Sequence, residues 1–325
     1  MPPPPPTVAD AIHLAAAGRI AEAIPILQHL AGRGDPEALF TLGDVFWRGV
    51  GVAPDLPRGR ALFKMASDAG NAAAVRGYTN LLANGVAGER NWAEALRRLA
   101  AEAQVDARRA QMRDLIAAME LTPEGDPAVV ARGEMLSLRP HVTLFRAAFT
   151  SAECDFLILV AEPTYEPSRI VDEYRDAGAE YREVQAELRT SDGSTLHALI
   201  EDPATQALTR RLAALSRTAP EQGEPLQILR YRPGQEYRPH HDWLNDPNPR
   251  VQTALVYLND DYAGGETAFV RTGLKVRGRC GDVLVFRSEG PDGGLDPLSE
   301  HAGLPVTAGI KYLASRWIRA GRHML

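Results

Sequence analysis

Apolar and small residues recur at helical spacing along residues 8–104, where the pattern predicts a series of amphipathic helices. Gly34 and Gly70 are 36 residues apart, and so are Gly49 and Gly85. A fixed period of this length is typical of solenoids of stacked helix pairs, so we expect an α-solenoid of three such units. An ordinary helical bundle with an accidental period is the alternative.

The pattern changes along the rest of the chain. Residues 105–122 have the spacing of one more amphipathic helix. After Arg139-Pro140, short apolar runs such as LQILRY, TALVYLND and KYLASRWI alternate with turn residues, which predicts a β-sandwich or barrel with helices near 151–161 and 203–217. The predicted organisation is therefore multidomain α + β: a disordered Pro-rich tail (1–7), helical repeats (8–104), a helix and linker (105–138) and a β-domain with flanking helices (139–325).

Composition excludes several functions. The 325 residues carry a net charge of −6, which gives no reason to expect nucleic-acid binding. No apolar run is long enough to cross a membrane, and MPPPPPTVADA lacks the layout of a secretory signal. Two distant cysteines, Cys154 and Cys280, fit a reducing compartment. We therefore predict a cytoplasmic protein that binds neither nucleic acid nor membrane.

The stretch YRPGQEYRPHHDWLND contains a candidate metal site. If it is a strand, His240 and Asp242 share one face, and His241 points to the other. The downstream histidines are His301 and His323, and His323 is too close to the C-terminus to be a rigid ligand. Two histidines and one carboxylate form the facial triad of non-haem Fe(II) oxygenases.

The pair His240-x-Asp242 is by itself weak, because a surface turn or a core histidine explains it about as often as a metal does. Lys311 strengthens the case: it lies beside an apolar strand, so its ammonium is expected to point inward and to need an anionic partner. The far carboxylate of 2-oxoglutarate would supply that partner.

At this point the chain resembles two known families. Residues 139–320 resemble the prolyl 4-hydroxylase-like branch of Fe(II)/2-oxoglutarate dioxygenases, through RTSDG, EPLQILRYRPGQEYRPHHDW, RVQTALVYLNDDYAGGETAF, GDVLVF and HAGLPVTAGIKYLASRWI in this order. The implied fold is a double-stranded β-helix, a distorted jelly roll. Residues 8–104 resemble Sel1-like repeats, which are related to the tetratricopeptide repeat.

The resemblance assigns roles to individual residues. It implies that His240, Asp242 and His301 bind iron and that Lys311 pairs with the cosubstrate carboxylate. Further residues match the cosubstrate pocket (Tyr231, Thr253 and Tyr257) or the substrate cleft (Arg189, Ser191, Glu224, Tyr237, Arg250 and Trp317). For Arg189, Arg250 and Trp317, ordinary ion pairs or core packing are the alternatives. Asp192, His197 and Arg319 depart from the family pattern, which puts the substrate in doubt.

The implied activity is hydroxylation of a peptidyl residue, most plausibly proline, with Fe(II) as cofactor, 2-oxoglutarate and O₂ as cosubstrates, and ascorbate as a candidate reductant. The repeats would dock a protein or peptide substrate, and part of the polar segment 172–193 would form a mobile lid. One alternative is a small-molecule or free amino-acid hydroxylase. The other is a peptide-binding adaptor without turnover.

Overall fold

The computed structural model describes residues 5–168, 170–171, 183–184 and 188–323. The chain divides into two compact units. The first comprises residues 1–118, 123–125 and 198–206, and the second comprises 119–122, 126–197 and 207–325. Most of the segment predicted to be a lid lies outside the described residues. Within the described part of the chain, no helix has both the length and the apolar character that a membrane span requires.

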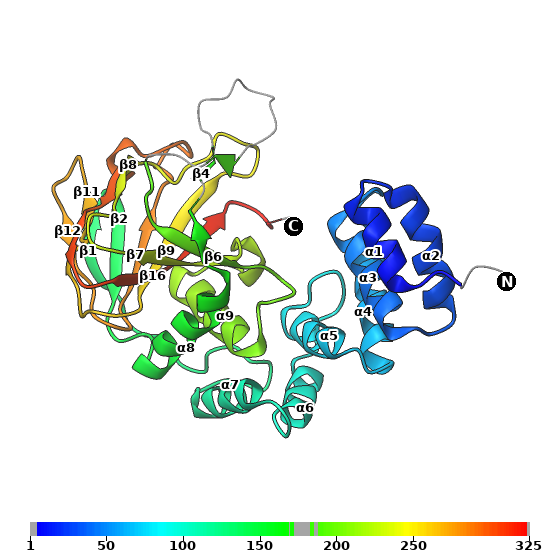
Figure 1. The fold of residues 1–325 in the computed structure, drawn as a ribbon. Helices are drawn as coiled ribbons and strands as arrows, with labels where there is room; N and C mark the ends of the chain where they lie inside the picture. Colours follow the sequence, from blue (N-terminus) through cyan, green and yellow to red (C-terminus); the bar gives the residue numbers. More distant parts are fainter. Residues whose placement is uncertain (1–4, 169, 172–182, 185–187, 324–325) are drawn as a thin grey trace. The chain divides into compact units, whose positions relative to one another are not determined.

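The first unit is a series of antiparallel helices in which each helix packs against the next one in the chain (Figure 1). Three helix pairs are followed by one further helix, as the sequence predicts. The helices are α1 (Val8–Ala16), α2 (Ile20–Gly32), α3 (Pro36–Arg48), α4 (Leu56–Asp68), α5 (Ala72–Asn84), α6 (Trp92–Glu102) and α7 (Ala107–Ala118).

The 36-residue period appears in the caps of these helices. Asp35 and Asn71, at the starts of α3 and α5, each accept a hydrogen bond from a backbone N–H of the first turn. Asp55 and Asn91 do the same for α4 and α6. Because both helix starts recur at the same interval, the second and third pairs are structural repeats of one another. The name Sel1-like stays a prediction.

A left-handed backbone ends the first helix of each of these pairs. Gly49 ends α3 with φ 70°, and Gly85 ends α5 with φ 75°. A Cβ at Gly49 would lie 2.6 Å from Cγ of Pro54, so the turn has no space for a side chain. The period in the sequence therefore reflects a turn that glycine makes possible.

Residues 198–206 belong to the helical unit, although the sequence analysis placed them in the β-domain. The side-chain amide of Asn80 donates to the carbonyl of Leu199 at 2.9 Å, and that of Asn84 donates to the carbonyl of Ala198 at 2.8 Å. These two amides satisfy backbone carbonyls of a segment that is more than 100 residues away in the chain. Such a long-range bond leaves no periodic signal in the sequence.

The second unit contains a large antiparallel sheet of eight strands in the order β1-β2-β13-β9-β16-β7-β6-β3. These strands are β1 (Glu134–Leu138), β2 (His141–Phe145), β3 (Glu166–Pro167), β6 (Asp192–Leu196), β7 (Leu226–Tyr231), β9 (Arg250–Tyr257), β13 (Val283–Arg287) and β16 (Lys311–Arg319). Since β1 pairs with β2 in this sheet, the β-domain begins before residue 139, the predicted boundary.

The smaller sheets complete the unit. A four-stranded sheet has the order β12-β11-β14-β8, and β10 pairs with β15 and β4 with β5. Their bounds are β4 (Ile170–Val171), β5 (Glu183–Val184), β8 (Tyr237–His240), β10 (Ala263–Gly264), β11 (Thr267–Phe269), β12 (Lys275–Val276), β14 (His301–Gly303) and β15 (Val306–Ala308).

The large and four-stranded sheets share one hydrophobic core. Leu229, Leu255 and Phe286 of the large sheet pack in one cluster with Phe269 of β11. The rings of Phe269 and Phe286 meet edge to face, with centroids 5.2 Å apart. Two sheets that enclose an apolar core in this way form the predicted double-stranded β-helix.

Helices α8 (Ser151–Ala161) and α9 (Pro203–Ser216) form at the two predicted places. From β16, the guanidinium of Arg316 donates to the carbonyl of Thr209 in α9 at 2.6 Å. Short 3₁₀ turns, at Glu162–Thr164, Pro220–Gln222 and Pro297–Ser299, connect other elements. Arg316 lies on the face of β16 opposite to the cavity-lining residues Leu313 and Ser315, so α9 packs on the face of the large sheet that points away from the cavity.

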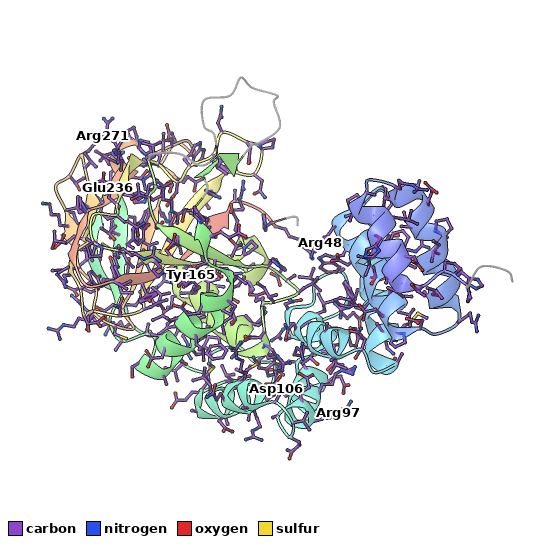
Figure 2. All side chains as sticks on the ribbon, viewed as in Figure 1. Arg48, Arg97, Asp106, Tyr165, Glu236 and Arg271 are labelled. Atoms are coloured by element: carbon purple, nitrogen blue, oxygen red, sulfur yellow. The ribbon has the colours of Figure 1, made fainter. Side chains whose placement is uncertain are left out.

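The helical unit has exposed ion pairs on its surface, and their arginines Arg48 and Arg97 are labelled in Figure 2. Arg48 pairs with Asp44 at 2.7 Å, and Arg97 pairs with Glu94 at 2.6 Å. Both arginine side chains are more than 60% exposed, at 66% and 69%, so each pair contributes only a few tenths of a kcal/mol. The caps and the apolar contacts therefore matter more for the stability of this unit.

We predict that Asn91→Ala lowers the free energy of unfolding by about 1 kcal/mol, because it removes the acceptor for the first turn of α6. Urea denaturation followed by far-UV circular dichroism measures the change. Asn91→Asp keeps an acceptor at the same place and should retain the stability of the wild type. Equal stability of the alanine and aspartate variants would contradict the role of the cap.

Candidate metal centre

Two histidines lie side by side on adjacent strands of the four-stranded sheet. Strands β8 and β14 pair antiparallel, and their register places His240 directly opposite His301. Directly opposed residues project from the same face, so the two imidazoles meet, with ring centroids 4.3 Å apart. The pairing of two strands that are far apart in the chain therefore creates the centre.

Asp242 completes the group from just beyond β8. The strand ends at His240, so Asp242 lies in an irregular segment, and the expectation that it continues the strand is wrong. Its Oδ1 lies 3.6 Å from Nε2 of His240, and its Oδ2 lies 3.5 Å from Nε2 of His301. One potential ligand atom from each of the three residues lies within 4.8 Å of the others. This donor set can hold one cation.

Backbone carbonyls orient both imidazole rings. Nδ1 of His240 lies 2.8 Å from the carbonyl oxygen of Arg238, and Nδ1 of His301 lies 3.0 Å from that of Ser299. A carbonyl only accepts, so each Nδ1 carries the proton and each Nε2 presents a lone pair to the centre. This is the arrangement of metal-ligating histidines.

The protonation states also suit a cation. Burial raises the pKa of the Asp242 carboxyl, but the His301 and His240 rings and the Thr253 hydroxyl outweigh it and hold this pKa well below its ordinary value. Burial, together with the neighbouring His240, lowers the pKa of His301 to about 4. At neutral pH the centre thus offers a carboxylate and a neutral imidazole, both of which bind metals.

The other two histidines considered lie outside this centre. Nδ1 of His241 lies 3.4 Å from the hydroxyl of Ser299, and the residue is half-buried away from the three ligand atoms. His323 donates its backbone N–H to the carbonyl of Glu221. Among the described residues, the His240, Asp242 and His301 group is the one cluster with metal-ligand geometry.

The centre opens into a cavity of about 400 Å³, mouth included. Strand β16 contributes every second residue from Lys311 to Trp317, because alternate side chains point to the same face. This alternation in KYLASRW could have identified Leu313 and Ser315, which the sequence analysis missed. The lining comprises Arg189, Leu229, Tyr231, Tyr237, His240, Asp242, Leu255, Thr267, His301, Gly303, Lys311, Leu313, Ser315 and Trp317.

A buried ammonium lies in the same cavity. Lys311 is 2% exposed, and its Nζ donates to the carbonyl of Gly265 at 2.7 Å. Nζ also lies 5.5 Å from the centroid of the Tyr231 ring. Burial lowers its pKa to about 8, although the charge of the Glu266 carboxylate opposes this shift. The cavity therefore contains a cation that an anionic ligand would neutralise.

Comparison with known proteins gives the family. A model of the 2OG-Fe(II) oxygenase superfamily matches residues 226–319. Prolyl 4-hydroxylase 1 of Arabidopsis thaliana is 35% identical over 206 residues, which cover 57% of this chain and 71% of that protein. The chain belongs to the prolyl 4-hydroxylase family. Its cofactor is Fe(II), and its cosubstrates are 2-oxoglutarate and O₂.

Two further relatives are similar in extent. Probable prolyl 4-hydroxylase 10 of Arabidopsis thaliana is 33% identical over 211 residues, with 57% of this chain and 71% of that protein covered. The viral collagen prolyl hydroxylase of Paramecium Bursaria Chlorella virus-1, solved as its 2OG complex, is 26% identical, with a TM-score of 0.40 and coverage of 55% of this chain and 96% of that chain.

Two of the three residues expected in the cosubstrate pocket of this prolyl 4-hydroxylase family member do not line the cavity. Tyr231 lines the cavity. The Thr253 hydroxyl instead donates a hydrogen bond to Oδ2 of Asp242, at 2.6 Å. Tyr257 is fully buried, and its hydroxyl lies 2.9 Å from that of Thr267. Thr253 therefore supports a candidate ligand, and Tyr257 packs behind the pocket wall.

Three of the expected substrate residues form a cluster at the cavity. Arg189 is 4% exposed, and its guanidinium carbon lies 4.9 Å from the ring centroid of Tyr237 and 5.8 Å from that of Trp317. Nε of Arg189 and Nε1 of Trp317 are both buried without a hydrogen-bond partner among the described residues. The cavity thus offers two N–H donors beside aromatic rings.

The remaining expected cleft residues do not line the cavity. The hydroxyl of Ser191 lies 2.9 Å from that of Ser168. Glu224 forms a two-pronged ion pair with Arg250, at 2.7 Å for each contact, and a further ion pair with Arg319. The Arg250 guanidinium lies 4.1 Å from the centroid of the Trp317 ring. Ser191, Glu224 and Arg250 are therefore not among the lining residues of the described cavity, and their role at a substrate stays a prediction. The Glu224 carboxylate holds Arg250 against Trp317.

The departures from the family pattern have structural partners. Asp192, on β6, pairs with Arg230 at 3.1 Å and also with Arg232. Arg319 bridges Glu224 and Asp246. His197 directly follows β6. Asp192 and Arg319 thus form ion pairs near the site and are not among the residues that line its cavity.

We predict that His240→Ala abolishes Fe(II) binding and that His241→Ala leaves it almost unchanged, because Nε2 of His240 alone of the pair faces Asp242. Anaerobic titration calorimetry with Fe(II) measures both variants. A matching loss of affinity in the two variants would show that the register of β8 does not select the ligand.

We also predict that Thr253→Val weakens Fe(II) binding about 10–100-fold, since the Asp242 carboxylate loses the hydroxyl that orients it. Thr253→Ser keeps this hydroxyl and should bind Fe(II) as the wild type does. The same anaerobic titration compares the three proteins. Wild-type affinity in the valine variant would remove the supporting role of Thr253.

Proposed function

We propose that this protein hydroxylates a prolyl residue of a peptide, with His240, Asp242 and His301 as the ligands of Fe(II) and Lys311 as the partner of the 2-oxoglutarate C5 carboxylate. One observation carries the proposal: the three ligand atoms and the buried ammonium line the same cavity. The similarity to plant prolyl 4-hydroxylases supports the choice of proline.

The residues fit the cofactor and the cosubstrate. Three protein ligands leave coordination positions for other molecules, as the facial triad requires. When bound, Fe(II) supplies the activation of O₂ that oxidises a C–H bond, while 2-oxoglutarate becomes succinate and CO₂. Lys311 would hold the far end of the cosubstrate, so that its keto-acid end points toward the histidines.

The protein positions the reactants and excludes water. Tyr237 stacks on His240 with ring centroids 3.5 Å apart, and Phe286 meets the His301 ring edge to face at 4.6 Å. These rings restrict both imidazoles and keep the walls of the centre apolar. Thr253 keeps one oxygen of Asp242 in place through its hydrogen bond. Such fixed geometry is the contribution that a protein makes to metal-centred oxidation.

The donors at the cavity favour a proline-rich peptide as the substrate. A prolyl residue has a carbonyl acceptor and no backbone N–H. Arg189 and Trp317 present buried donors without partners among the described residues, so they can bind peptide carbonyls. A free amino acid would bring an ammonium group next to the Arg189 guanidinium, which is unfavourable.

The proposal extends to the helical repeats and to the location of the protein. The helical unit would dock the protein or peptide that carries the target proline, because solenoids of helix pairs commonly bind peptides on their surface. Both cysteines, Cys154 and Cys280, are free thiols, which supports a cytoplasmic location.

Succinate formation with a synthetic proline-rich peptide tests the proposed function. The wild type should release succinate and add 16 Da to the peptide, whereas free proline at the same concentration should give little product. Asp242→Ala, which removes a ligand, should be inactive with both. Wild-type turnover no greater than that of Asp242→Ala on proline peptides would overturn the proposal, and turnover of free proline alone would favour the small-molecule hydroxylase.

We predict that the affinity for 2-oxoglutarate falls as pH rises through about 8, because the Lys311 ammonium has a pKa of about 8 and is neutral above it. Above that pH the dissociation constant should rise up to tenfold per pH unit, since the dianion binds the protonated form. Anaerobic titration of the Fe(II) protein with 2-oxoglutarate between pH 6.5 and 9.5 measures this. Lys311→Met should weaken binding about 100-fold at pH 7.

Lys311→Arg is the matched control for this titration. A guanidinium stays charged across the whole pH range. We therefore expect Lys311→Arg to bind 2-oxoglutarate more weakly than the wild type, with an affinity that does not change near pH 8. An unchanged pH dependence in Lys311→Arg would assign the titration to another group.

A further inference from the structure

Strand β1 forms one edge of the eight-stranded sheet, far from the strands that carry the candidate ligands in the strand order. Among the described strands it pairs with β2 alone, so the backbone groups on its outer side face no described strand. Such an edge can pair with a further strand, and natural proteins usually protect it with charges or irregular backbone. The side chains of β1 therefore decide whether this edge is protected or is an interface.

Two large apolar side chains of β1 are exposed at this edge: Met135 is 55% exposed and Leu138 is 73% exposed. Residues three positions apart normally point to opposite faces of a strand. Here the register shifts between Met135 and Ser137, so that Met135 lies opposite Thr143 of β2. Leu138 lies opposite His141, which shares a face with Thr143. The bulge therefore places both exposed apolar side chains on one face.

The stretch EMLSLR, residues 134–139, is complementary to a second copy of itself. If two copies pair antiparallel about the centre of this stretch, Glu134 of each copy lies opposite Arg139 of the other. Met135 of each copy then lies opposite Leu138 of the other. Opposite charges and apolar pairs in directly opposed positions both stabilise a sheet. One register thus satisfies the charged ends and covers the exposed apolar side chains.

The two charged side chains are available for this contact. Glu134 is 60% exposed, and its carboxylate lies 3.8 Å from the Arg146 guanidinium. Arg139 is 59% exposed, and its guanidinium lies 3.7 Å from the Asp296 carboxylate. Ion pairs that are so long and exposed contribute little to stability. Their exchange for closer pairs between two copies is therefore not opposed by the fold.

We propose that β1 is a dimerisation surface, at which it pairs antiparallel with β1 of a second copy of this chain to form one continuous sheet. The contact is two-fold symmetric, so each copy uses its β1 edge once and the assembly closes at the dimer. Because β1 has only five residues, the interface is small and a dissociation constant on the order of 10 µM is expected. None of its residues lines the cavity, so the inference is independent of the proposed function.

Sedimentation equilibrium of the full-length protein between about 1 and 100 µM, a range that brackets the affinity of a small interface, tests the dimer. The wild type should change from one chain to two over this range. Leu138→Lys should weaken dimerisation at least about tenfold, because it sets an ammonium in the apolar pair. A wild type that stays monomeric at every concentration would overturn the inference and leave this edge to a strand of another protein.

Charge reversal tests the register. Glu134→Arg and Arg139→Glu should each weaken dimerisation about tenfold, because like charges then lie opposite one another. The double variant exchanges the two charges and should dimerise as the wild type does. Arg48→Glu is the matched control: it makes the same charge change as Arg139→Glu on an exposed side chain of the helical unit and should leave dimerisation unchanged.

The outcomes are distinct. A double variant as weak as the single variants would overturn the proposed pairing, and so would single variants that dimerise like the wild type. Far-UV circular dichroism should be the same for all variants, which shows that each one folds. Succinate formation separates the inference from the proposed function: an active protein that is always monomeric refutes the dimer alone, and an inactive protein that dimerises as expected refutes the activity alone.

Discussion

The register between β8 and β14 is the constraint on which the candidate site depends. It sets His240 opposite His301, and a shift by one residue would turn one imidazole to the other face of the sheet. The carbonyls of Arg238 and Ser299 belong to the same two chain segments, so one pairing fixes both the position and the tautomer of each ring. Asp242 then needs only the two residues after β8 to reach the centre.

Buried charge is the second feature that shapes the β-domain. Asp242 and Lys311 are 5% and 2% exposed, and a charge without a partner is costly in such surroundings. The carboxylate has the Thr253 hydroxyl and two imidazoles as neighbours, whereas the ammonium has one carbonyl and two aromatic rings. One cavity therefore has a carboxylate that favours a cation and an ammonium that favours an anion in its lining. The proposed binding of 2-oxoglutarate uses this asymmetry.

Cation–aromatic contacts organise the part of the cavity around Trp317. Arg189 lies between Tyr237 and Trp317, and Arg250 packs on Trp317 while Glu224 fixes its guanidinium. Arg319, which departs from the family pattern, joins the same carboxylate and also reaches Asp246. The ion pairs thus hold the aromatic wall in position from outside the cavity. A substitution of Arg319 would therefore remove ion pairs that support this wall and would not remove a residue that lines the cavity.

Local patterns in the sequence were sufficient for much of this structure. The 36-residue period predicts the helix pairs, because the second and third pairs carry caps at the same positions and the same glycine turns. The family resemblance points to His240, Asp242, His301 and Lys311, although Asp242 lies beyond the end of β8 and not on the strand that the sequence analysis assumed. The tertiary structure alone decided the roles of Thr253, Tyr257 and Glu224, as well as the placement of residues 198–206. These depend on hydrogen bonds and ion pairs between segments that are distant in the chain. The pattern of residues along the sequence predicts which face of a helix or strand a side chain lies on, but it does not predict which distant residue packs against that face.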